Sequence, residues 1–225
     1  MTGKIASTSP SVAVRAKLSH PVIDGDAHVL EGEFVIADYV KQVGGAKLLA
    51  RLGEATVLAG ALAAAFAAAA RTVTVVTGAH ADEIEAVARK FAAAGAGASR
   101  LRIVHAPDYA EGLSASLRAG LAALPASAEG AFLFLGDMPR IPAGIAASLA
   151  AAIGEAKAAA PVYRGRRGHP VLVSSALFGP LMQLRGDQGA GGLLAGLGDD
   201  LVLVEVEDGG VLFDVDVPED LAAAL

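Results

Sequence analysis

The chain has 225 residues, of which 54% are hydrophobic and 19% are charged. This is enough apolar material for the core of one domain of ordinary size, and it excludes a globally disordered chain. The formal net charge of −6, from 18 Lys and Arg against 24 Asp and Glu, argues against nonspecific nucleic-acid binding. Without cysteine there are no disulfides, thiolate nucleophiles or cysteine metal ligands, which agrees with a reducing cytoplasm.

The N-terminal region carries neither a secretory signal nor a membrane span. Residues 1–20 are polar, lack the apolar core of a signal peptide, and are expected to be mobile. The longest uncharged apolar run, residues 55–70, is dominated by alanine and is shorter than the roughly 20 residues that a membrane helix needs. The run therefore predicts a buried or half-buried helix. We predict a cytoplasmic protein with neither a membrane nor a nucleic acid among its partners.

From residue 35 onward, short β-branched runs alternate with alanine-rich stretches. Strands are predicted over residues 72–77, 101–105, 131–135, 171–173 and 201–206. Helices are predicted over residues 81–94, 113–124, 143–160 and 218–225. The alternation is typical of βαβ units. It predicts an α/β fold with a mainly parallel, Rossmann-like sheet, helices on both faces, and the continuously apolar strand 131–135 near the centre.

Carboxylates at two places are candidate metal ligands. Such sheets bind ligands beyond the carboxyl ends of their strands, and Asp137 follows the apolar strand in Leu135–Pro139 (LGDMP). A carboxylate there can hold Mg²⁺, which prefers hard oxygen ligands, or cap the next helix. Asp214 and Asp216 share one face if their segment is extended. They can complete a metal site with Asp137, or Asp216 can help to start the last helix.

Three further motifs are polar and rich in glycine or serine. Tyr163–Pro170 (YRGRRGHP) places three guanidiniums in a loop, which is either a phosphate-binding element or a solvated basic loop. Gly186–Gly192 (GDQGAGG) is a turn that opens a helix, where it binds a ligand or caps that helix. Ser114 and Ser116 lie at a helix start, where they cap the helix or contact a ribose or base.

Six segments in this order resemble the MobA-like nucleotidyltransferases, and within them the molybdenum cofactor cytidylyltransferase group. The resemblance covers roughly residues 44–225 and includes TVVTGAHADEI, VHAPDYAEGLSASLRAGLAALP, FLFLGDMPRIP, YRGRRGHPVLVSSALF, LRGDQGAGGLL and FDVDVPEDL. It implies a fold of the nucleotide-diphospho-sugar transferase type over residues 34–225. Residues 1–33 are then expected to form a partly disordered N-terminal extension.

The resemblance also implies an activity and a set of site residues. The implied reaction is Mg²⁺-dependent transfer of CMP from CTP to the phosphate of molybdopterin, with release of pyrophosphate and with a molybdoenzyme or its chaperone as a partner. Lys47 and Asp137 are the implied catalytic residues, and the implied metal ligands are Asp137, Asp214 and Asp216. The implied nucleotide-binding residues are Gly44, Gly45, Lys47, Gly78, Ser114 and Ser116. The implied acceptor-binding residues are Arg166, Arg167, His169, Asp187 and Gln188.

The chain departs from the family in the glycine-rich triphosphate loop, whose pattern is L-A-A-G-x-S-x-R-M-G-x-x-K. Counting back from Lys47 without gaps keeps Gly44 and Gly45 but puts Asp38 at the loop glycine and Gln42 at the loop arginine. A carboxylate facing a triphosphate repels it, and a residue other than glycine resists a tight anion-binding loop. The alternative function is therefore a catalytically impaired carrier of the same fold that binds a nucleotide or the pterin.

A second resemblance lies upstream, over roughly residues 20–45. This segment is similar to the opening of metal-dependent amidohydrolases, in which a strand delivers a metal pair, here Asp26 and His28. That family needs a barrel of about 250 residues with further ligands. The later histidines of this chain all lie in motifs of the nucleotidyltransferase family. A metal-dependent hydrolase is thus a third hypothesis, and an exposed polar turn is the other interpretation of Asp26 and His28.

Overall fold

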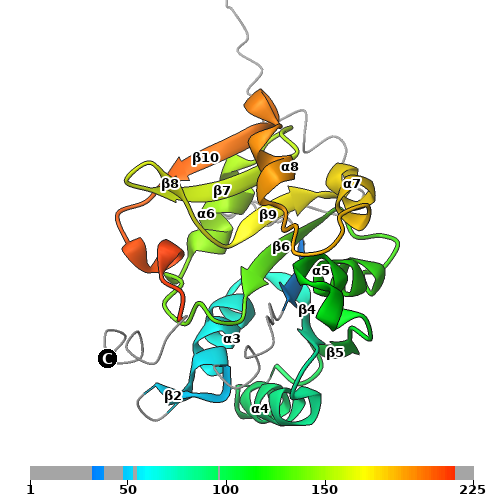
Figure 1. Cartoon of the computed structure of the whole chain (residues 1–225). Coiled ribbons are helices and arrows are strands. Elements are labelled where there is room, and N and C mark those ends of the chain that lie inside the picture. Colours follow the sequence, from blue (N-terminus) through cyan, green and yellow to red (C-terminus); the bar gives the residue numbers. More distant parts are fainter. Residues whose placement is uncertain (1–31, 38–47, 53–54, 96, 216–225) are drawn as a thin grey trace, which may run out of the picture.

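The computed structural model describes residues 32–37, 48–52, 55–95 and 97–215 (Figure 1). Within these ranges, eight strands form one central sheet in the order β10-β7-β9-β6-β1-β4-β5, and β8 pairs with β7. In chain order these strands are β1 (Gly32–Ala37), β4 (Ala70–Thr77), β5 (Leu101–His105), β6 (Gly130–Leu135), β7 (Ala158–Tyr163), β8 (Arg166–Arg167), β9 (Val171–Ser174) and β10 (Leu201–Glu205). A separate antiparallel pair joins β2 (Arg51–Leu52) to β3 (Ala55–Thr56).

The sheet is mainly parallel, as predicted. β1 runs parallel to both of its neighbours, β4 and β6, and β4–β5 and β7–β10 are parallel pairs. β9 is antiparallel to both β6 and β7. β6 lies between β9 and β1, so the prediction of a central apolar strand over 131–135 is confirmed.

Helices cover both faces of the sheet, and the strand side chains alternate between the two cores. Val73, Val75 and Phe134 belong to one core, which they share with α3 (Val57–Ala67), α4 (Ala81–Ala94) and α6 (Ile145–Ala152). Val76 and Leu133 belong to the other core, with α5 (Leu113–Ala122), α7 (Phe178–Met182) and α8 (Gly191–Ala195). This alternation, which follows from the period of two along a strand, buries the sheet on both sides (Figure 1).

Two predicted helices form where the sequence placed them. The helix predicted over 81–94 is α4, which buries Ile84, Ala88 and Ala92 along one face and carries two acidic residues in its first turn. The apolar run 55–70 contains the largely buried α3, whose N-cap Thr56 accepts a hydrogen bond from the Ala59 N–H (3.2 Å). No helix in the described part of the chain is long and apolar enough to cross a membrane.

The helix predicted over 143–160 is wrong in its second half. α6 ends at Ala152, Gly154 turns the chain with a φ of +52°, and Ala158–Tyr163 form β7. Alanine favours helices in isolation, but here three consecutive alanines are fully buried in a strand between β10 and β9. Packing inside the sheet therefore overrides local propensity.

Two other expectations lie at the ends of the described chain. The mobility of residues 1–20 and the helix over 218–225 fall outside the described residues. The predicted domain boundary after residue 33 falls within β1, which pairs with β4 and β6 from Gly32 onward. The division into residues 1–33 and 34–225 stays a prediction.

Candidate nucleotide and acceptor site

The carboxyl ends of the central strands define the candidate site. β1 ends at Ala37, which pairs with Val76 of β4 on one side and Leu135 of β6 on the other. Gly78 follows β4, and Asp137 follows β6, so both lie close to the point where the chain leaves β1. This edge of an open α/β sheet is where such folds bind ligands.

Asp137 is buried, with 6% of its surface exposed, in the turn after β6. Its carbonyl oxygen accepts a hydrogen bond from the Val215 N–H (3.0 Å), so the segment carrying the exposed Asp214 runs beside it. The structure thus brings together two segments predicted to hold the metal; Asp216 lies outside the described residues. No group of three or more His, Asp or Glu side chains that could hold a metal occurs in the described part of the chain. Mg²⁺ fits nevertheless, because it commonly takes one or two carboxylates plus substrate phosphates.

His169 lies in the same region, packed against β6 and the chain's last described segment. Its Nδ1 is 3.4 Å from the Leu133 carbonyl oxygen, and a carbonyl can only accept, so Nδ1 carries the hydrogen. Its backbone N–H donates to the Val211 carbonyl (2.9 Å) in the 3₁₀ helix η4 (Gly209–Leu212). Burial lowers the pKa of His169, against the opposing effects of the Leu133 hydrogen bond and the Asp137 charge. The imidazole is therefore neutral at pH 7.

The lowered pKa of His169 predicts that the stability of the fold depends on pH. Because the folded-state pKa is lowered, the neutral ring contributes stability that is fully present above the unfolded pKa of about 6.5 and is lost as the pH falls below it. In the parent, the free energy of unfolding should fall as the pH is lowered from about 7.5 to about 5.5. In His169→Gln this fall should be less steep, and the two slopes should differ by at most about 1.4 kcal/mol per pH unit. Urea unfolding in EDTA measures this. His105→Gln, at an exposed histidine on β5, is the control, and equal slopes in H169Q and the parent would contradict the prediction.

The predicted basic loop divides into three arginines with different surroundings. Arg167 donates from Nη2 to the Gly191 carbonyl (3.0 Å) at the start of α8, which ties this loop to the glycine-rich loop 186–192. Arg164 has a φ of +50° and places its guanidinium 5.0 Å from the centre of the Tyr163 ring. Arg166 is exposed, and its side chain makes no hydrogen bond or ion pair with the described residues. The side-chain donors of Arg166 are therefore available to a ligand.

The glycine-rich loop also meets the start of α5. A Cβ on Gly112, whose φ is +119°, would lie 2.6 Å from Oδ1 of Asp187. Ser114 is fully buried, and both its N–H (3.1 Å) and its hydroxyl (2.8 Å) donate to the Gly186 carbonyl. Ser116, two residues further along α5, is also buried. The hydroxyl of Ser114 therefore holds the loop 186–192. It also lies at the start of α5, where contact with a nucleoside was predicted.

Gly78 belongs to the same group of contacts. A Cβ at this position would lie 2.7 Å from Cγ of Tyr109, whose ring covers the glycine at the end of β4. Tyr109 belongs to the 3₁₀ helix η1 (Tyr109–Glu111), which leads directly into Gly112 and α5. Several of the predicted nucleotide-side and acceptor-side residues therefore lie along one chain of contacts. It runs from Gly78 through the start of α5 and loop 186–192 to Arg167.

Some predicted site residues are not placed, and some important ones were not predicted. Gly44, Gly45 and Lys47 lie outside the described residues. Sequence reasoning missed the contact of Tyr109 with Gly78 and the hydrogen bond from Nη1 of Arg118 to the Ser114 hydroxyl (2.9 Å). The i, i+4 spacing of Ser114 and Arg118 on a helix was a usable signal for the second contact. A cavity of about 110 Å³ between α3 and α6 is lined mainly by alanine and contains none of the predicted site residues.

The fold and this edge of the sheet are those of a nucleotidyltransferase, and the chain belongs to the MobA-like NTP transferase domain family, whose model matches residues 39–201. The chain is similar to the molybdenum cofactor cytidylyltransferase of Escherichia coli strain K12, with 33% identity over 127 residues. That match covers 56% of this chain and 63% of the relative, which is less than two thirds of its length.

Solved structures share this fold over most of the chain. A homologue, from Mycobacterium sp. strain JC1, of the Mycobacterium tuberculosis protein Rv0371c is 30% identical, with a TM-score of 0.71 over 86% of this chain and 96% of that one. Rv0371c itself, solved as a complex with manganese, is 24% identical, with a TM-score of 0.71 over 88% of this chain and 99% of that one. At that identity, the second likeness shows the fold alone.

Proposed function

We propose that this chain transfers CMP from CTP to the terminal phosphate of molybdopterin or the molybdenum cofactor and releases pyrophosphate. The observation that carries the proposal is the arrangement at the carboxyl edge. There the Asp137 turn and the Asp214 segment are joined by a backbone hydrogen bond, and the His169–Arg167 loop lies beside them. The family and the similarity to the cytidylyltransferase of Escherichia coli support the choice of nucleotide and acceptor.

The proposed reaction needs little proton chemistry. An oxygen of the acceptor phosphate attacks the α-phosphorus of CTP, and the bond from that phosphorus to the β-phosphate oxygen breaks as pyrophosphate leaves. The acceptor is already an anion, so the site has mainly to align the groups and neutralise charge. Asp137, with Asp214 or Asp216, would hold Mg²⁺, which supplies charge neutralisation on the phosphates. Lys47 would meet the triphosphate.

The two sides of the site have different tasks in this proposal. Gly44, Gly45, Gly78, Ser114 and Ser116 would line the nucleotide side. Arg166, Arg167, His169, Asp187 and Gln188 would line the acceptor side. The neutral His169 adds no charge repulsion beside Arg167, so the guanidiniums remain the local cations for an acceptor phosphate. The product would then pass to a molybdoenzyme or its chaperone in the cytoplasm.

The test is a thermal-shift titration of the full chain with CTP, GTP and ATP in Mg²⁺, followed by a pyrophosphate-release assay with molybdopterin. A ligand that binds only the folded state stabilises it by about 2.7 kcal/mol at a hundred times its Kd. We expect CTP to give the largest shift and to release pyrophosphate only with the acceptor present. Preferential stabilisation by GTP or ATP would contradict the proposed nucleotide.

A second candidate function is a carrier that binds the nucleotide or the pterin without turning it over. It is favoured by Asp38 and Gln42, which replace the loop glycine and arginine of the family in the segment directly after β1. The same titration separates the two functions. A carrier would be stabilised by a ligand but would release no pyrophosphate, even with both substrates and Mg²⁺ present.

The basic loop yields a direct prediction about the acceptor. We expect Arg166→Ala and Arg167→Ala to weaken molybdopterin binding by about tenfold or more each, because a charge-assisted hydrogen bond is worth roughly 1.5–3 kcal/mol. CTP binding should change much less. Arg164→Ala is the matched control, because its guanidinium lies over Tyr163 in the same loop. Titration calorimetry with each ligand measures both affinities, and equal losses for CTP and molybdopterin would make the acceptor-side assignment wrong.

A further inference from the structure

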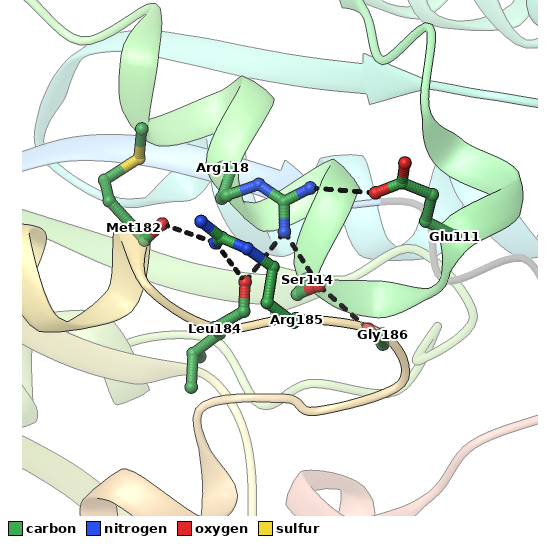
Figure 2. Close-up of polar contacts among 7 residues, drawn as sticks. All are labelled: Glu111, Ser114, Arg118, Met182, Leu184, Arg185 and Gly186. Atoms are coloured by element: carbon green, nitrogen blue, oxygen red, sulfur yellow. Dashed lines mark hydrogen bonds and ion pairs between the residues drawn. The ribbon is translucent and has the colours of Figure 1, made fainter.

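Arg118 on α5 makes contacts that reach far along the chain. Its side chain is 18% exposed, and its Nη1 donates both to the Ser114 hydroxyl (2.9 Å) and to the Leu184 carbonyl (2.8 Å). Its Nη2 donates to Oε2 of Glu111 at 3.4 Å (Figure 2). Leu184 is 66 residues away in sequence, so one guanidinium joins the start of α5 to the segment between α7 and α8.

The Ser114 hydroxyl extends this connection by one step. It accepts from Arg118 and donates to the Gly186 carbonyl, two residues after Leu184. Two carbonyls of the segment Leu184–Gly189, called here the acceptor loop, are thus held from α5, one directly and one through Ser114 (Figure 2). Arg185 also donates to the Leu184 carbonyl, but that bond stays within the loop and does not reach α5.

Packing independently shows that the acceptor loop lies directly on the start of α5. A Cβ on Gly112 would lie 2.6 Å from Oδ1 of Asp187 and 2.7 Å from its backbone nitrogen. A Cβ on Gly189 would lie 2.7 Å from Cδ2 of Leu113. All three distances are so short that a side chain at either glycine would force its neighbour to shift. The loop therefore fits at two places where glycine leaves room, and Arg118 holds it there.

We propose that Arg118 is a positioning residue that fixes the acceptor loop, and with it Asp187 and Gln188, against the nucleotide-side helix α5. The inference rests on the proposed function, because it assigns the loop to the acceptor. Arg118 touches neither substrate in this assignment. It acts through the Leu184 carbonyl and the Ser114 hydroxyl.

Loss of Arg118 should loosen the loop more than the helix. α5 keeps its own backbone hydrogen bonds and buries Leu117 and Leu121 in the core. The acceptor loop contains no helix or strand, and its Leu184 and Gly186 carbonyls accept hydrogen bonds from α5. The two substrates should therefore be affected to different extents. We expect Arg118→Met to raise the KM for molybdopterin by about tenfold or more, as loss of a charge-assisted bond predicts, and to change the Kd for CTP less than about twofold.

The experiment uses the full chain in two parallel measurements. Amide hydrogen exchange over residues 184–189 reports how well the loop is held, and steady-state transfer assays report KM and kcat for each substrate. Arg118→Met removes the charge and its donors, and Arg118→Lys keeps the charge and should restore part of both properties. Arg89→Met on α4 is the matched control, because Arg89 also lies on a helix and pairs with a glutamate, Glu85 (2.6 Å), at an exposed site.

Gly112→Ala is a second variant that disturbs the contact between the start of α5 and the acceptor loop, and it does so independently of Arg118. The expected result is faster exchange of the loop in R118M and G112A, about tenfold, with a selective rise in the molybdopterin KM and no change in R89M. Unchanged exchange in R118M would overturn the inference. Faster exchange with an unchanged molybdopterin KM, or with equal losses for CTP, would overturn it too. A parent chain without transferase activity would contradict the proposed function instead, and hydrogen exchange would still decide whether Arg118 holds the loop.

Discussion

Replacing Asp137 with asparagine should lower the rate of nucleotidyl transfer by about 10²–10³-fold, the usual cost of removing one group that stabilises charge in a transition state. Asp137 is the buried carboxylate at the end of the central strand β6, beside the Asp214 segment. Asparagine has nearly the same shape, so it removes the charge while leaving the turn intact. The loss should appear in kcat at saturating Mg²⁺, as measured by pyrophosphate release.

Asp199→Asn is the control for this change, because Asp199 is exposed in the 3₁₀ helix η3 (Gly198–Asp200). Its transfer rate should match that of the parent. Thermal unfolding of both variants checks that the fold is retained. If D137N keeps more than about a tenth of the parent rate, the carboxylate does not hold the metal, because a ligand to the catalytic cation contributes more than that.

The double variant Asp38→Gly with Gln42→Arg should bind CTP with Mg²⁺ more tightly by two or more decades. A carboxylate a few ångströms from a phosphate costs on the order of 1 kcal/mol when solvated and several when dry. A restored arginine contact adds roughly 1.5–3 kcal/mol, and each 1.4 kcal/mol is about tenfold. β1 ends at Ala37, and the gap-free alignment places Asp38 at the loop glycine of the family. Asp38 is the next residue in the chain.

A direct CTP titration of the parent, both single variants and the double variant measures this gain. The two single variants serve as controls. Asp38→Gly removes the repulsion and Gln42→Arg restores the cation, so the gain in binding free energy of the double variant should approach the sum of the two single gains. Turnover should rise along with affinity in the double variant. If the parent already binds CTP tightly and the double variant gains nothing, the alignment of residues 34–47 is wrong and the triphosphate is held by another route.

Much of the fold follows from local patterns. Strand β5 and helix α4 were predicted with the bounds that the structure shows, because their apolar residues recur with one clear period each. β7 was missed because alanine carries little β signal and favours helices. Gly154 was the available sign that the helix predicted over 143–160 had to end early. The reversed direction of β9 depends on pairing across the sheet, which no local pattern encodes.

The candidate site, like the fold, was predictable from the sequence only in part. Polar residues after a strand could be found from the sequence, because the carboxyl edge of such a sheet is a general binding place. Asp137 and the segment at Asp214 do lie together there. The link from Arg118 to Leu184 could not be predicted, since it joins residues 66 apart through a carbonyl oxygen that every residue possesses. The resemblance to a known family, rather than spacing, supplied the roles of the acceptor-side residues.

The hydrogen bonds of residues 211–215 make the candidate site depend on the end of the described chain. Strands β1, β4, β5 and β6 are complete once residue 135 has been synthesised, but a domain generally folds as a unit. The Asp137 carbonyl accepts from the Val215 N–H, and the His169 N–H donates to the Val211 carbonyl. A chain that stops before residue 211 would therefore contain these four strands but lack both hydrogen bonds at the candidate site.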